Sequence, residues 1–137
     1  MAEKNVNIGS SLTKFTFSDD SGEVIAHFCM NPADVRIVER AREVSEYFKS
    51  RSGNFDGSNA AESMAKYDRE LTEKVNYLLG YDASKTLFCR ISATAVMDDG
   101  RFFAKLVMDT IAQNLKEELN RRFEKFKAVS KYTAKYE

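Results

Sequence analysis

The chain has 137 residues, and its 21 Lys and Arg residues balance its 21 Asp and Glu residues, so the net charge at pH 7 is zero. A chain of this length suits one domain, residues 1–137, that buries a core without metals or disulfides. The balanced charge argues against a duplex-DNA binder held by a strong overall positive field. One histidine and two cysteines without a CxxC pair argue against zinc, so we expect neither metal nor cofactor.

The sequence predicts a cytoplasmic protein that makes no membrane contact. No apolar run approaches the roughly 20 residues of a membrane-spanning helix, and the first residues lack the apolar core of a signal peptide. Cys29 and Cys89 are then expected to be two reduced, buried thiols.

Two β-compatible runs predict a hairpin at about residues 13–30. The turn sequence Asp19-Asp-Ser-Gly22 separates them. The apolar faces are expected to comprise Phe15 and Phe17 on the first strand, and Val24, Ala26, Phe28 and Met30 on the second. His27 falls on the other face without an obvious partner, so we interpret it as a packed histidine rather than a chemical group.

Three amphipathic stretches predict long helices at about residues 32–51, 59–79 and 101–130, which makes the fold α+β and mostly helical. Asn31 and Pro32 are expected to cap and open the first helix, and Ser58 or Asn59 to cap the second. Residues 53–59 predict a flexible connector. The predicted stripes are Val35, Val38, Ala41, Val44 and Phe48 on the first helix, and Met64, Tyr67, Leu71, Val75 and Leu78 on the second.

The stretch YLLGYDASKTLFCR, from Tyr77 to Arg90, admits two interpretations. A phosphate-binding loop would need several glycines after a buried strand, whereas here one glycine follows a helical stripe. We therefore predict a corner, with Gly80 as a left-handed helix cap and Asp82 capping a short helix that follows.

No catalytic constellation is recognisable, so we expect a protein that is not an enzyme. The apolar run from Ile91 to Met97 does not decide between a short helix and a buried extended segment. Asp98 and Asp99 precede a glycine, which indicates a solvated turn or a helix cap rather than a pair of catalytic carboxylates.

The stripe of the last helix continues past the part that a small core can cover. Phe102, Phe103, Leu106, Ile111 and Leu115 are expected to pack on the first two helices, whereas Leu119, Phe123 and Phe126 run on toward the chain end. Burying the ring of Phe123 or Phe126 would contribute about 1.5–3 kcal/mol each. We therefore predict a partner-binding surface anchored by Leu119, Phe123 and Phe126, with Arg121, Arg122 and Lys125 as its polar rim.

A second apolar surface is conceivable where the last helix begins. Phe102 and Phe103 are adjacent there, with Met97 and Met108 nearby, and methionine adapts to irregular partners. Taken singly, each of these residues is more typical of an ordinary core.

Four features occur in a characteristic order: an aromatic strand pair, Asn31-Pro-Ala-Asp34 opening a helix, the glycine corner at residues 80–88, and a long helix leading into the tail at residues 131–136. In this order they resemble the small tail assembly chaperones of bacteriophages and prophages of Gram-positive bacteria. The resemblance implies a non-enzymatic role in the host cytoplasm, holding the tape-measure protein soluble while the tail tube assembles around it. The tail here is less uniformly basic than in that family.

Two further functions remain open. One is a structural tail or head–tail component that is retained in the particle. A small regulatory or nucleic-acid-binding protein would instead use the tail at residues 122–137, where basic residues alternate with aromatic ones. The small charge excess and the lack of an RNP pair make nucleic acid the less favoured partner.

Overall fold

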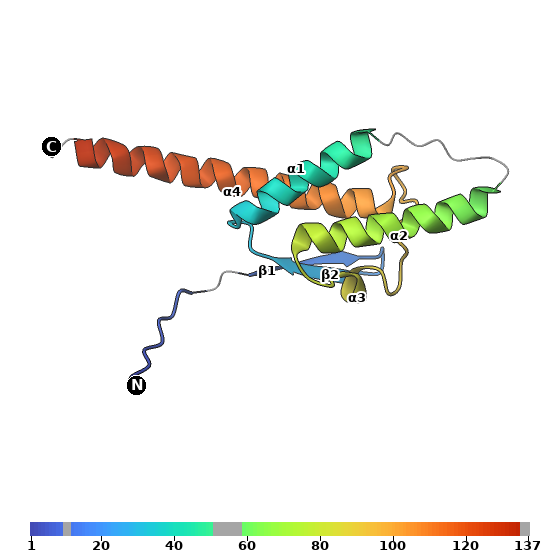
Figure 1. Ribbon diagram of the computed structural model, residues 1–137, viewed down its shortest axis with the longest axis horizontal. Helices are drawn as coiled ribbons and strands as arrows, with labels where there is room; N and C mark the ends of the chain where they lie inside the picture. The colour runs from blue at the N-terminus through green and yellow to red at the C-terminus, as the bar shows by residue number, and fades with distance from the viewer. Residues whose placement is uncertain (10–11, 51–58, 135–137) are drawn as a thin grey trace.

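The computed structural model describes residues 1–9, 12–50 and 59–134, with the side chains of the last helix described as far as Val129. The elements follow in the order β1 (Thr13–Ser18), β2 (Val24–Met30), α1 (Val35–Ser50), α2 (Ala60–Leu79), α3 (Ser84–Leu87) and α4 (Phe103–Ala134). The predicted α+β, mostly helical class is thus confirmed. Helix α1 packs on α2 and α4, α2 packs on α4, and α3 packs on β2, and α4 continues well past them (Figure 1).

The hairpin forms as predicted, with β1 and β2 antiparallel and Phe15 opposite Phe28. Their rings stack with centroids 4.9 Å apart. A side-chain oxygen of Asp19 accepts backbone N–H bonds from Ser21 and Glu23 and so closes the turn. Val24, which the strand pattern placed on the core face, is exposed, because it pairs with Ser18 beside a bulge at the turn end.

The core lies between the hairpin and helices α1, α2, α3 and α4. Phe28 and Phe103 are its largest buried side chains. The edges of the Phe17 and Phe88 rings meet the Phe103 ring at centroid distances of 5.3 and 5.8 Å. Such edge-to-face contacts add to the free energy of burial and fix the angle between hairpin and helix.

The start of α1 differs from the prediction. The helix begins at Val35, and Asp34 rather than Asn31 caps it, because an oxygen of the Asp34 carboxylate accepts the Arg36 N–H at 2.9 Å. Val35 in the first turn is exposed, and Ile37, which the predicted stripe omitted, lies in the core.

The corner after α2 is confirmed at Gly80, which adopts a left-handed φ of 81° and donates its N–H to the Asn76 carbonyl oxygen. The predicted cap of the next helix is wrong: Asp82 makes no cap bond to α3. Instead, the side-chain oxygen of Asn76 accepts the Ser84 N–H at 2.9 Å. The carboxylate of Asp82 accepts bonds from the Asn76 amide and the Ser84 hydroxyl.

The segment that the sequence left undecided is a folded loop that opens α4. Ala93 and Ala95 accept the first two backbone N–H groups of the helix, those of Ala104 and Phe103, at 2.9 and 2.8 Å. These bonds satisfy donors that every helix start leaves free. Asp98 and Asp99 lie in a turn, as expected.

Other predictions at helix ends and thiols have mixed outcomes. Asn59 occupies the cap position of α2 without a side-chain cap bond. The predicted connector lies outside the described residues except for Asn59. Cys29 is half-buried, but Cys89 is exposed, contrary to expectation, because Leu87 and Phe88 take the inward positions beside it.

Candidate functional site

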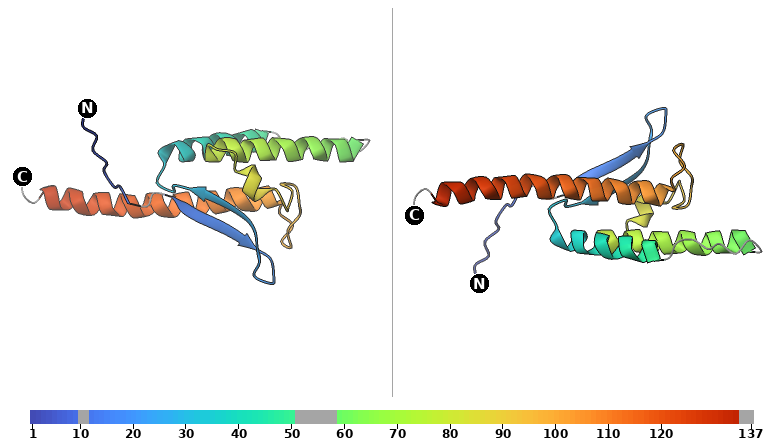
Figure 2. Two further views of the ribbon diagram at one scale, coloured as in Figure 1. Left: turned by 90° about the horizontal axis from the view of Figure 1, so that it is seen from below. Right: turned by 90° about the horizontal axis from the view of Figure 1, so that it is seen from above.

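Helix α4 divides into a buried half and an exposed half. In the first half, Phe103, Val107, Ile111 and Leu115 belong to the core. In the second half, Leu119, Phe123, Phe126 and Val129 are 44%, 58%, 67% and 63% exposed. All views show this half extending beyond the rest of the fold (Figures 1 and 2). The prediction that the apolar stripe extends beyond the core, and is exposed there, is therefore confirmed.

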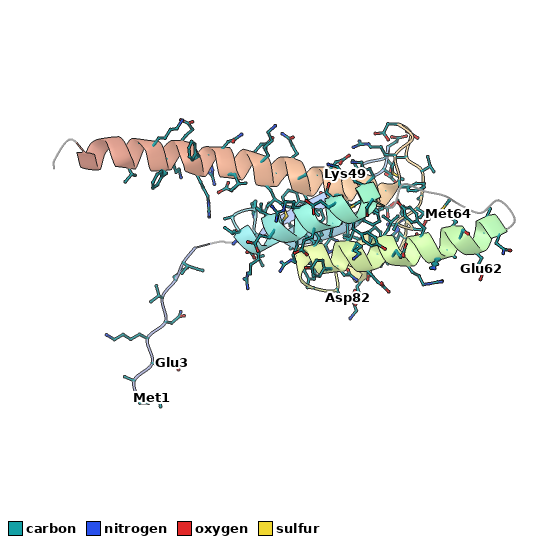
Figure 3. The ribbon with its side chains drawn as sticks, turned by 45° about the horizontal axis from the view of Figure 1, so that its top comes forward. Met1, Glu3, Lys49, Glu62, Met64 and Asp82 are labelled. Carbon is teal, nitrogen blue, oxygen red and sulfur yellow. The ribbon has the colours of Figure 1, made fainter. Side chains whose placement is uncertain are left out.

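We call Leu119, Phe123, Phe126 and Val129 the terminal stripe. Their spacing of three and four residues places them on one face of the helix, which turns once every 3.6 residues. Val129 was not predicted as part of the stripe, although it follows Phe126 by three residues and so continues the helical spacing. The side chains crowd where α1 and α2 cross α4, and stand apart along the projecting half (Figure 3). A contiguous apolar face left in water is typical of a site for a partner.

The predicted rim residues Arg121 and Arg122 are already held by a shared carboxylate. Glu118, whose side chain is 15% exposed, accepts bonds at 2.7 Å from Arg121 and pairs at 3.4 Å with Arg122. The bond from Arg121 lowers the pKa of Glu118, so this carboxylate stays ionised. Arg122 also donates to the Ala33 carbonyl oxygen at 3.2 Å, which ties α4 to the chain just before α1.

Two lysines complete the surroundings of the terminal stripe. The Nζ of Lys127 lies 4.8 Å from the centre of the Phe123 ring and 3.7 Å from Glu124. Lys125, the remaining predicted rim residue, is exposed. A cation on the ring face stabilises the exposed aromatic and holds its orientation.

The second predicted apolar surface proves to be mostly core. Phe103 is buried, and Met97, Phe102 and Met108 pack partly buried against the core. A pocket of about 310 Å³ remains between α1 and α4, lined among others by Val44, Phe48, Leu78 and Met108. A smaller pocket of about 240 Å³ shares Phe48 and Met108 with it.

A third pocket, of about 420 Å³, was not predicted, because its polar residues come from separate elements. It is lined by His27, Cys29 and Tyr81, among others. The Cys29 N–H donates to the Tyr81 hydroxyl oxygen at 2.8 Å, and the Thr86 hydroxyl donates to the His27 carbonyl oxygen at 2.7 Å. Burial raises the pKa of Tyr81, so its hydroxyl stays protonated. These bonds close the outer edge of β2 and give the cluster a structural role.

Metal binding and membrane crossing are two other functions to consider for residues 1–9, 12–50 and 59–134. No group of three His, Cys, Asp or Glu side chains there could hold a metal ion. Within the same residues, no helix combines the length and apolar character that crossing a bilayer requires.

The structure brings all six predicted partner-binding residues together within about two turns of α4. Their binding role stays a prediction. Comparisons with protein-family models, curated proteins and solved structures find no match to this chain.

Proposed function

We propose that this chain is a non-enzymatic assembly chaperone that holds a helical segment of a larger client on the terminal stripe. The observation that carries the proposal is the exposure of Phe123 and Phe126 on a helix that projects beyond the core. With the resemblance of the sequence to phage tail assembly chaperones, the proposed client is a tape-measure protein in the host cytoplasm.

The energetics support a protein partner for this surface. Covering each phenylalanine ring contributes about 1.5–3 kcal/mol, and aromatic anchors dominate the binding energy of most interfaces. An apolar stripe on one helix is the surface against which an amphipathic helix packs. Arg121, Arg122 and Lys125 then set the orientation of the client more than its affinity.

The proposal is tested first by the gene neighbourhood, which should hold a large tape-measure gene, and then by co-expression of this chain with the product of that gene. The native chain should keep that protein soluble and copurify with it. The change Phe123→Ser with Phe126→Ser should abolish copurification, because it removes both anchors.

A matched control removes two exposed apolar side chains elsewhere. Val6→Ser with Ile8→Ser changes the N-terminal segment, where both residues are exposed. This variant should copurify as the native chain does. Equal capture by the Phe123, Phe126 double variant would place the binding surface away from α4 and contradict the proposal.

A further inference from the structure

The charged residues in the second half of α4 are sorted by helix face. At 3.6 residues per turn, Lys116 and Lys127 fall on the border of the terminal stripe next to Phe123. Lys125 falls near the opposite border, and Arg121 lies farther round, toward the polar face. Arg122 lies on the stripe face itself. Cations therefore flank the apolar stripe on both sides.

The carboxylates occupy different positions. Glu117 and Glu124 fall on the face opposite the stripe, by the same spacing. Glu118 is the acid nearest to the stripe and lies on its border between Val129 and Lys125; its side chain is 15% exposed and pairs with Arg121 and Arg122. A partner that covers the stripe thus meets positive charge along both edges, although the whole chain is neutral.

We infer that the client segment is an amphipathic helix whose apolar face is flanked by Asp and Glu side chains. This inference rests on the proposed function and specifies the chemistry of the partner. Opposite charges along two packed helices favour the intended partner and direction and disfavour cationic alternatives.

The surface suits a protein helix better than an anionic membrane or a single-stranded nucleic acid. Helices that lie on membranes carry Lys and Arg across their polar face, whereas Glu117 and Glu124 occupy the middle of the polar face here. Nucleic-acid platforms offer free ring faces for base stacking, whereas Lys127 already occupies one face of the Phe123 ring.

Two labelled peptides test the inference with the full chain. Both form helices of about 20 residues with the same leucine face, and they differ only in carrying Glu or Lys along the borders of that face. Fluorescence anisotropy should show the Glu peptide binding about tenfold more tightly at low salt. The difference should shrink toward unity at about 0.5 M salt, because screening weakens exposed charge pairs.

Charge reversal provides the matched variants. Lys116→Glu with Lys125→Glu changes one exposed cation on each border and should reverse the preference toward the Lys peptide. Lys66→Glu with Arg69→Glu makes the same change in net charge on exposed positions of α2 and should leave the preference unaltered. Circular dichroism checks that both variants keep the helical content of the native chain.

The outcomes separate the inference from the proposed function. Equal binding of both peptides, lost on Phe123→Ser with Phe126→Ser, would overturn the acidic-client inference and leave helix capture standing. Binding of phosphatidylserine vesicles or of single-stranded DNA with neither peptide bound would overturn both. An unchanged preference in the border variant would overturn the assignment to these two lysines.

Discussion

Arg40 of α1 donates a hydrogen bond from Nε to the carbonyl oxygen of Leu78, in the last turn of α2, at 3.1 Å. A cation at a helix C-terminus satisfies a free carbonyl and complements the helix dipole. Arg40→Met keeps the apolar stem but removes this bond, so the free energy of unfolding should fall by about 1–2 kcal/mol. Urea titration measures it. Arg42→Met, at an exposed position of α1, should change stability by less than about 0.5 kcal/mol.

Gly80 should resist replacement because its φ of 81° is left-handed. Gly80→Val should lower the free energy of unfolding by about 1–2 kcal/mol from the backbone alone. An added Cβ would lie 3.1 Å from Nη2 of Arg40, a flexible side-chain end that can shift. Gly80→Asn should cost less, since asparagine tolerates this conformation. An unchanged melting temperature for Gly80→Val would contradict the cap.

Asn76 is expected to matter more than Asp82 at the corner. Asn76→Ala removes the acceptor of the Ser84 N–H and should destabilise the fold by about 1 kcal/mol. Asn76→Asp retains an acceptor oxygen for Ser84 but loses the amide bond to Asp82 and sets two carboxylates side by side, so it should recover only part of that loss. Thermal denaturation of both variants checks this. A larger loss of stability for Asp82→Ala than for Asn76→Ala would show that Asp82 is the more important cap of α3.

The difference between these residues shows what local patterns reveal. Gly80 was predictable because a helical stripe that ends at a glycine is a signal contained in a few neighbouring residues. The capping role of Asn76 and the bond from Arg40 depend on how three segments pack, so sequence spacing alone does not indicate them. Asp34 and Asn31 are both good caps, and sequence preference alone does not choose between them.

The candidate site was predictable for a similar reason. The spacing of apolar residues as far as Phe126 can be read from neighbouring positions. A chain of this length has too small a core to cover the whole stripe, so an exposed end was predictable. The hydrogen bonds from the first N–H groups of α4 to the carbonyl oxygens of Ala93 and Ala95 were not predictable, because the segment from Ile91 to Met97 has no periodicity. The sharing of Glu118 by two arginines needed the side-chain geometry.

Arg101 should make stability depend on acid pH. It bonds Asp99 at 2.7 Å and Asp109 at 2.9 Å. Its bond to Asp99 lowers the pKa of that carboxyl. For Asp109, partial burial raises the pKa, but bonds from Lys105 and Arg101 outweigh it and the net shift is downward. An Asp whose pKa is lower in the folded chain than in the unfolded chain, where it is about 3.9, stabilises the fold at any pH above that value. The stabilisation is lost as the pH falls below about 3.9 and through the folded-state pKa.

The melting temperature should therefore fall most steeply below about pH 4. Arg101→Gln should lower it at neutral pH and flatten its fall in acid, because both carboxyl groups return toward their ordinary pKa. Lys66→Gln, at an exposed position on α2, should reproduce the native profile. An equally steep acid fall in the Arg101 variant would assign the pH dependence to other carboxylates.

The two halves of α4 should respond differently to loss of apolar side chains. Ile111 is fully buried, so Ile111→Ala should lower the free energy of unfolding by about 2–5 kcal/mol. Phe123→Ser with Phe126→Ser removes more apolar surface, yet stability should change by less than about 0.5 kcal/mol per site, because both rings lie mostly in water. Light scattering after size-exclusion chromatography should find this double variant monomeric, since the terminal stripe is also the surface available for self-association. A variant that unfolds would show that the two rings belong to the core, and one that still forms oligomers would place the contact between copies elsewhere.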